Sequence, residues 1–292
     1  MQLAEIKAIF HKELSVLYPK VEVDSFFYQS LEHFLKLERF VLVMQPNYTI
    51  TKEEEQPLFE ALSRLKNEEP LQYIFEEAHF MDLILKVNRY TLIPRPETEE
   101  LVQWIINDYQ VEPFESAKER PHQDLKVLDI GTGSGCIAIA LAKYLPNAQV
   151  FALDISEEAL QVAKKNAELN GVSIEFIEAN ILNVSTALST GFDIIVSNPP
   201  YVREQEKIEI NNNVKEYEPS LALFVPNNNP LVFYKAIGEF TNTYLKEKGS
   251  LYLEINQYLG LETKSLFEYQ NFSKIELKKD IFENDRMIKC QK

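Results

Sequence analysis

The run Asn198-Pro199-Pro200-Tyr201 combines residue types that can hold a planar nitrogen group. It follows the stretch 195–197, and because prolines cannot continue a ladder of hydrogen bonds, a buried strand should end here. The Asn198 side-chain oxygen and the Pro199 carbonyl offer two acceptors for the two N–H bonds of an amide or amine. Pro200 stiffens the turn, and Tyr201 can pack against a flat group. Catalysis at such a site would be mostly positioning, which contributes roughly 7–11 kcal/mol at best.

A second candidate site is the glycine run Gly131-Thr132-Gly133-Ser134-Gly135, which lies between an apolar strand pattern and an apolar helix pattern. Glycines at such a junction allow a tight turn and the close approach of a ligand to the backbone. A dinucleotide-binding loop has the spacing G-x-G-x-x-G, whereas here the third glycine comes one residue early and Cys136 takes its place. The G-x-G-x-G spacing resembles the S-adenosylmethionine (SAM) loop of Rossmann-like methyltransferases. We therefore favour a cofactor-binding loop over a purely structural turn.

Asp154 ends the next predicted strand, where a carboxylate can accept hydrogen bonds from both ribose hydroxyls of an adenosine. Its alternative role is to cap the helix that starts near Glu157. Ser156 is the better capping residue for that helix, so Asp154 stays available for the ribose.

Asn180 and Ile181 follow the third predicted strand and should reach the same edge of the sheet. Asn180 could make a hydrogen bond to the adenine, and Ile181 an apolar contact with its ring. An ordinary strand end explains these two residues nearly as well. Asp129 lies within the end of the first strand, where we expect it to hold either the glycine loop or the methionyl ammonium of the cofactor.

Composition favours a soluble cytoplasmic protein that does not bind nucleic acid through a broad basic surface. The chain has 292 residues with 45% hydrophobic and 26% charged residues, and its formal net charge is −15. Contacts with nucleic-acid phosphates need Lys and Arg, so an acidic surface suits a basic protein partner better. The only cysteines, Cys136 and Cys290, suggest neither a zinc site nor a disulfide framework. No apolar run approaches the roughly 18 residues that span a bilayer, and the start of the chain lacks signal-peptide character.

The pattern of apolar residues predicts three regions. Residues 1–75 are predicted to form a helical bundle in which Thr51 and Glu54 form a capping box. Two roles are open for this bundle: a folding or dimerisation module, and a docking surface for a macromolecular substrate. Residues 76–93 should form a hairpin linker, and residues 94–292 a catalytic domain. Within the catalytic domain, a helix follows Pro94, and a loop is expected at 110–124.

From residue 125 onward, predicted strands alternate with predicted helices. This alternation indicates an α/β fold with an open, mostly parallel sheet covered by helices on both faces, as in a Rossmann-like methyltransferase domain. Seven strands are expected, at 126–130, 148–155, 174–179, 193–198, 249–255, 274–279 and near 287–290. Helices are expected near 136–145, 157–170, 231–247 and 260–270.

Together, VLDIGTGSG and SNPPY resemble the amino-methyltransferases that act on planar nitrogens, including DNA adenine and protein-glutamine methyltransferases. Further segments resemble the release factor glutamine methyltransferase family and extend the resemblance over most of the chain. These segments are EPLQYI at 69–74, LIPRPETEELV at 92–102, EYEPSLALF at 216–224, LYLEI at 251–255 and KDIFENDRMI at 279–288.

This resemblance implies methyl transfer from SAM to the side-chain amide nitrogen (N5) of the glutamine in the Gly-Gly-Gln motif of class I peptide chain release factors. Asn198 and Pro199 would hold that glutamine, with Pro200 and Tyr201 beside it. The loop 131–135, Asp154, Asn180, Ile181 and Asn198 would bind SAM, which leaves S-adenosylhomocysteine as the product. Arg95 and Glu97 would order the PRPETEE segment or contact the donor. The enzyme would be a metal-independent monomer that does not bind nucleic acid directly or associate with a membrane.

The chain departs from the family pattern at four places. Glu76 and Ser220 stand where the family usually has Gly and Arg, Asn180 replaces an acid near the adenine, and VPNNNP replaces a glycine-rich stretch. Two other functions are less consistent with the sequence. A nucleic-acid adenine or guanine N-methyltransferase would need a basic channel, which the charge disfavours. A degenerate SAM-binding protein would not need the intact Asn198-to-Tyr201 run.

Overall fold

The structure, a computed structural model, describes residues 1–109, 125–183 and 191–292. The chain divides into two compact units, one of Met1–Glu77 with Asn211–Tyr217 and one of Ala78–Ile210 with Glu218–Lys292. The loop expected at 110–124 lies outside the described residues. The division predicted from the sequence, with boundaries after residues 75 and 93, stays a prediction.

The first unit is helical, as the apolar spacing predicts. Its helices are α1 (Leu3–Leu14), α2 (Lys20–Leu35), α3 (Val41–Met44), α4 (Lys52–Leu65), α5 (Leu71–Phe75) and α9 (Asn212–Tyr217). Thr51 caps α4, because its side chain accepts a hydrogen bond from the Glu54 N–H at 3.3 Å while the Glu54 carboxylate accepts one from the Thr51 N–H at 2.8 Å. The predicted capping box is therefore confirmed.

Glu76 follows α5 in a left-handed conformation with φ +55°. Glycine adopts this conformation without strain, whereas a residue with a Cβ does not. Glu76, which stands where the family usually has Gly, therefore has a side chain at a position whose left-handed backbone favours glycine.

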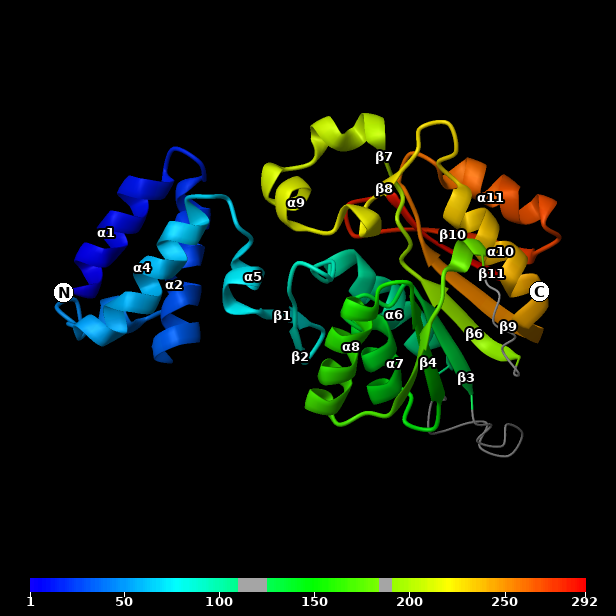
Figure 1. Cartoon of the computed structure of the whole chain (residues 1–292), viewed down its shortest axis with the longest axis horizontal. Coiled ribbons are helices and arrows are strands. Elements are labelled where there is room, and N and C mark those ends of the chain that lie inside the picture. Colours follow the sequence, from blue (N-terminus) through cyan, green and yellow to red (C-terminus); the bar gives the residue numbers. More distant parts are fainter. Residues whose placement is uncertain (110–124, 184–190) are drawn as a thin grey trace. The chain divides into compact units, whose positions relative to one another are not determined.

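The second unit contains a seven-stranded sheet in the order β10-β11-β9-β6-β3-β4-β5 (Figure 1). Its strands are β3 (Lys126–Ile130), β4 (Gln149–Asp154), β5 (Ile174–Glu178), β6 (Phe192–Ser197), β9 (Leu245–Glu254), β10 (Ser273–Lys279) and β11 (Asp285–Gln291). Only β11 pairs antiparallel with its neighbours, so the prediction of a mostly parallel sheet is confirmed. After β5 the chain returns to the other side of β3, which makes the β3–β6 edge the switch point where such sheets bind ligands.

Helices cover both faces of this sheet, with α6, α7 and α8 on one face and α10 and α11 on the other (Figure 1). Their bounds are α6 (Pro96–Tyr109), α7 (Cys136–Tyr144), α8 (Glu157–Asn170), α10 (Val232–Tyr244) and α11 (Gly260–Tyr269). Successive strand residues point to opposite faces, so Val127 joins the core under α7 and Leu128 the core under α10. Burial of both faces of the central strands accounts for their largely apolar sequences.

Short elements complete the unit. They are β1 (Glu77–Phe80) with β2 (Leu83–Lys86), β7 (Val202–Arg203) with β8 (Phe224–Val225), and the 3₁₀ helices η1 (Ile181–Asn183), η2 (Glu204–Glu209) and η3 (Ser220–Ala222). The largest differences from the predicted boundaries are at α10, which ends at Tyr244 instead of near 247, and at β9, which begins at Leu245 instead of near residue 249. A register shift against β6 explains the earlier start of β9, since Phe192 pairs with Leu245 but Ile194 pairs with Ser250.

Candidate active site

A cavity of about 370 Å³ opens at the carboxyl ends of β3, β4, β5 and β6. Most of the residues predicted to bind cofactor or substrate line this cavity. They are Gly131, Thr132, Gly133, Ser134, Asp154, Asn180, Ile181, Asn198, Pro199 and Pro200. Gly135 and Tyr201 are not among the lining residues.

Two glycines of the loop have different surroundings. A Cβ atom on Gly131 would meet no atom within 4 Å, so the backbone there faces open space in the cavity wall. A Cβ on Gly135 would lie 2.9 Å from Ile139 Cδ1 and 3.1 Å from Ala163 Cβ. Gly135 therefore allows α7 to begin in close contact with α8, a packing role that the sequence spacing did not distinguish from ligand binding.

Asp154 ties the glycine loop to the end of β4. Its carboxylate accepts hydrogen bonds from the Gly133 N–H at 2.8 Å and from the Ser156 N–H at 3.0 Å. Burial raises the pKa of this carboxyl, and these backbone hydrogen bonds oppose the rise. Ser156 caps α8 by accepting from the Ala159 N–H at 3.0 Å, so the prediction that Ser156 and not Asp154 caps the helix is confirmed.

Asp129 lies beneath the loop and is fully buried. Its Oδ2 accepts a hydrogen bond from the Thr132 hydroxyl at 2.6 Å, while Oδ1 has no hydrogen-bond partner among the described residues. Burial raises the pKa of Asp129 to about 7. Because this side chain does not line the cavity, the geometry fits support of the loop, the first of its two expected roles.

Asn180 and Ile181 lie where β5 gives way to the 3₁₀ helix η1. The Asn180 side-chain oxygen accepts a hydrogen bond from the Leu182 N–H at 2.9 Å, which starts that turn. Ile181 and Leu182 present apolar surface to the same part of the cavity.

Asn198 follows β6 directly and belongs to a chain of buried hydrogen bonds. Its Nδ2 donates to Thr98 Oγ1 at 3.1 Å, and the Thr98 hydroxyl donates to Glu254 Oε2 at 2.6 Å. The Tyr201 hydroxyl donates to the other oxygen, Glu254 Oε1, at 2.8 Å. Burial raises the pKa of Glu254, whose side chain lies at the end of β9.

Thr98 and Glu254 were missed as functional candidates, although both lie in segments that carry the family resemblance. Tyr201 also differs from expectation, because its ring packs into the core beneath α10 and its hydroxyl is held by Glu254. Nothing in the local sequence shows that these three residues meet, since they lie 53 to 156 positions apart.

One wall of the cavity is held by an ion pair between the half-buried Arg95 and the buried Glu218. Arg95 Nη2 donates to Glu218 Oε1 at 2.6 Å, and the Ile93 N–H donates to Glu218 Oε2 at 3.1 Å. Arg95, Pro219 and Leu221 all line the cavity, so Glu218 joins the PRPETEE segment to the EYEPSLALF segment. This contact gives Arg95 an ordering role, and Glu97 is not among the lining residues.

Across the described ranges, no group of three or more His, Cys, Asp or Glu side chains is placed to hold a metal ion. None of the helices in the same ranges has the length and apolar character needed to cross a membrane.

Comparison with known proteins gives matches to both parts of the chain. Residues 121–282 match the family model of a methyltransferase domain, and residues 28–75 match that of the PrmC N-terminal domain. Among solved structures, a methyltransferase from Pyrococcus furiosus is 16% identical with a TM-score of 0.51, over 82% of this chain and 98% of that one. A human methyltransferase 10 domain containing protein is 17% identical with a TM-score of 0.51, over 72% and 88%. These likenesses support the Rossmann-like fold.

Curated relatives match nearly the whole length. The release factor glutamine methyltransferase of Flavobacterium psychrophilum is 52% identical over 289 residues, which is 99% of each chain. The enzyme of the same name from Bacteroides thetaiotaomicron is 40% identical over 283 residues, 97% of this chain and 98% of that one. With this similarity and the geometry of its cavity, the chain belongs to the release factor glutamine methyltransferase family.

Proposed function

We propose that this protein transfers a methyl group from SAM to the side-chain amide nitrogen (N5) of the glutamine in the Gly-Gly-Gln motif of class I peptide chain release factors. The relatives' shared name supports a release factor glutamine as the acceptor. The observation that carries the proposal is the placement of Asn198, which lines the cavity directly after the central strand β6. Its side-chain nitrogen donates a hydrogen bond to Thr98. The side-chain oxygen thus remains to accept from a substrate N–H.

The cavity fits an adenosine-containing cofactor. Its volume lies in the range of roughly 300–1,000 Å³ that is usual for small-molecule sites. The backbone of the Gly131–Ser134 loop would approach the donor closely, Asp154 would accept from the ribose hydroxyls, and Asn180 and Ile181 would face the adenine. SAM supplies an electrophilic methyl group on a sulfonium, so the protein needs only to place the nucleophile.

The chain's contribution to catalysis is the grip on the glutamine. An amide nitrogen is a poor nucleophile because its lone pair is delocalised into the carbonyl. The Asn198 oxygen and the Pro199 carbonyl would accept its two N–H bonds and so aim the lone pair at the methyl group. Pro200 fixes the turn that presents the Pro199 carbonyl. Tyr201 supports this turn from the core through Glu254.

The helical residues 1–75 would provide a docking surface for the release factor. The hairpin region 76–93 would link them to the catalytic domain at 94–292. The acidic chain would suit a basic protein partner. The enzyme would act as a cytoplasmic monomer on the protein and would not bind nucleic acid directly.

The proposal is tested by incubating the enzyme with SAM and an unmodified class I release factor and mapping added methyl groups by tandem mass spectrometry. We expect one methyl group, on the glutamine of the Gly-Gly-Gln motif, and none on a factor in which that glutamine is replaced by alanine. Methylation elsewhere on the factor, or of nucleic acid only, would overturn the substrate assignment. SAM binding without any transfer to the factor would favour a degenerate binding protein.

A further inference from the structure

We infer that Thr98 and Glu254 determine which way the side-chain amide of Asn198 faces, so that its oxygen and not its NH2 group is turned toward the substrate nitrogen. The inference rests on the proposed role of Asn198 in holding the glutamine. It makes Thr98 and Glu254 positioning residues, since neither is proposed to touch the reacting atoms.

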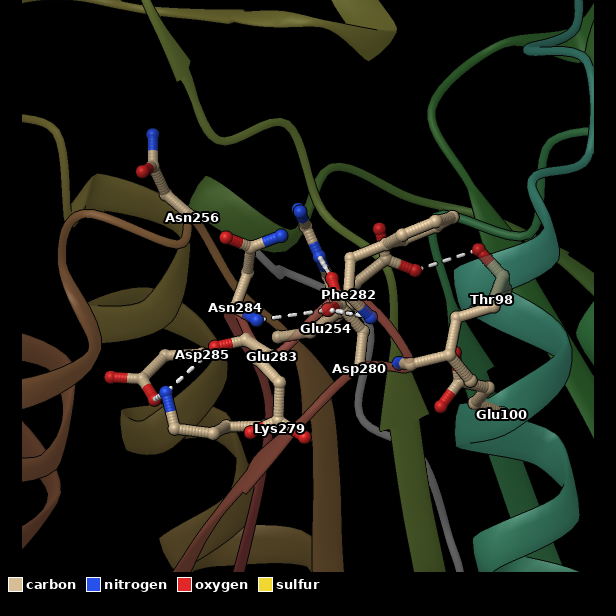
Figure 2. Close-up of polar contacts among 12 residues, drawn as sticks. Thr98, Glu100, Glu254, Asn256, Lys279, Asp280, Phe282, Glu283, Asn284 and Asp285 are labelled. Carbon is tan, nitrogen blue, oxygen red and sulfur yellow. Dashed lines mark hydrogen bonds and ion pairs between the residues drawn. The ribbon is translucent and has the colours of Figure 1, made fainter.

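The three residues come from separate elements and meet at the wall of the cavity, which Thr98 and Asn198 line, with Glu254 buried near Thr98. Thr98 lies in the first turn of α6 and Glu254 at the end of β9, and their side chains point toward each other (Figure 2). Thr98 is 2% exposed and Glu254 is 1% exposed. Hydrogen bonds in such surroundings are stronger than in water, and an unmatched polar group costs more.

The number of hydrogens on each group determines which group donates and which accepts in the hydrogen bonds that join Asn198, Thr98 and Glu254. The hydrogen bonds from Thr98 and Tyr201 and the nearby Arg286 cation favour the ionised form of Glu254 against the effect of burial. In that form the carboxylate has no hydrogen, so Glu254 accepts from Thr98 at Oε2 and from Tyr201 at Oε1. Thr98 has a single hydroxyl hydrogen, which this bond uses. Thr98 Oγ1 can then only accept, and the group of Asn198 that meets it at 3.1 Å must be the NH2 group.

The direction matters because the two ends of an asparagine amide have the same shape and opposite hydrogen-bonding character. With the NH2 group bound to Thr98, the oxygen is left for the glutamine N–H. With the amide reversed, Asn198 would present its own N–H bonds to the N–H bonds of the substrate. Two donors would then face each other, and the grip on the nucleophile would be lost.

A second layer of contacts holds Glu254 and Tyr201 in place. Arg286 on β11 lies with Nη1 3.5 Å from the Tyr201 hydroxyl oxygen, so this cation favours a Tyr201 hydrogen that points to Glu254. Arg286 is fixed by Asp280, which accepts from its Nε at 3.1 Å. Asp280 also accepts from the backbone N–H groups of Phe282 and Asn284, each at 2.9 Å (Figure 2). The segment KDIFENDRMI thus supports the Asn198 amide indirectly, through Tyr201 and Glu254.

The test compares three threonine variants of the full-length enzyme. Thr98→Val removes the hydroxyl but keeps the shape, and Thr98→Ser restores it. Thr263→Val is the matched control, because Thr263 is also a fully buried helical threonine, and its hydroxyl donates to the Leu259 carbonyl at 2.7 Å away from the cavity. Thr98→Val removes the hydrogen bonds to both Asn198 and Glu254, and the loss of the one that holds the Asn198 amide should lower kcat for release factor methylation roughly 10-fold, with little change in the Kd for SAM. Thr98→Ser should recover most of kcat, and Thr263→Val should leave it unchanged.

Glu254→Gln provides a second variant, because a glutamine side chain can donate to Thr98 and so reverse the direction of the bonds. It should also lower kcat with little change in SAM affinity. An unchanged kcat in both Thr98→Val and Glu254→Gln would overturn the inference, as would a loss in Thr98→Val that Thr98→Ser does not recover.

A readout that needs no substrate separates this inference from the proposed function. The Asn198 side-chain NH2 resonances, assigned by their absence in Asn198→Asp, should exchange slowly with solvent in the wild type and faster in Thr98→Val. Equal exchange in the two proteins would contradict the inference even if methylation is confirmed. If the wild type methylates no release factor, the proposed function fails, while the exchange rates still decide how the amide is held.

Discussion

Replacing Gly135 or Gly131 by alanine separates the packing role of the glycine loop from its binding role. Both glycines have left-handed backbones, with φ +84° at Gly135 and φ +72° at Gly131. An alanine costs about 1–2 kcal/mol in that conformation at either position. Only at Gly135 would the new Cβ meet packed atoms, at 2.9 Å and 3.1 Å, which adds an overpacking cost of about 1–3 kcal/mol.

We therefore expect Gly135→Ala to lose about 2–5 kcal/mol of unfolding free energy and Gly131→Ala only about 1–2 kcal/mol. Urea denaturation of both variants without SAM measures these values. Repeating it with saturating SAM measures the binding role, because a ligand that binds only the folded state raises its stability. SAM should stabilise the wild type strongly and Gly131→Ala much less, since the new methyl group occupies space that the donor would approach. Equal losses in the two variants would refute the packing argument, and full stabilisation of Gly131→Ala by SAM would refute the approach of the donor to this loop.

Three further predictions concern single residues. Asp154→Asn should weaken SAM binding about 10- to 100-fold in calorimetry, because the proposed ribose hydrogen bonds lose their charged acceptor; an unchanged Kd would contradict that role. Burial raises the pKa of Asp129 from its ordinary 3.8 to about 7, so the folded protein binds this proton more tightly than the unfolded chain, and stability is lost as pH rises between about 4 and 7. Relative to Asp129→Asn, the wild type should lose roughly 4 kcal/mol of unfolding free energy across that window, and a difference that is independent of pH would exclude this origin. Glu76→Gly should raise stability by about 0.5–1 kcal/mol, because relief of the left-handed strain at φ +55° outweighs the stability lost to the larger unfolded-state entropy of glycine; a lower Tm would contradict this.

Local rules explain why much of the fold was predictable. The alternation of apolar strands with amphipathic helices depends on periods of a few residues, and it predicted the seven strands of the sheet and both layers of helices. The caps at Thr51 and Ser156 depend on residues three positions away, so they too could be read from the sequence. The late start expected for β9 was wrong because the register shift against β6 depends on a strand about 50 residues earlier.

The cavity lining was largely predictable for a similar reason. Residues that directly follow parallel strands must meet at one edge of the sheet, which places Asp154 and Asn198 at the same cavity. The supporting contacts were not predictable, because no short-range pattern pairs Thr98 with Glu254 across 156 positions or Ile93 with Glu218 across 125. The sequence also could not show that Gly135 faces a helix and Gly131 faces the cavity.

The most direct test of the account is the turnover of Asn198→Ala on an unmodified class I release factor, with saturating SAM and with SAM affinity measured in parallel. We expect a loss of about 100- to 1,000-fold in kcat, the usual effect of removing one preorganised hydrogen-bonding group from an active site, while SAM stays bound at the saturating concentration. A variant that turns over like the wild type while SAM stays bound would show that the Asn198 amide does not hold the glutamine.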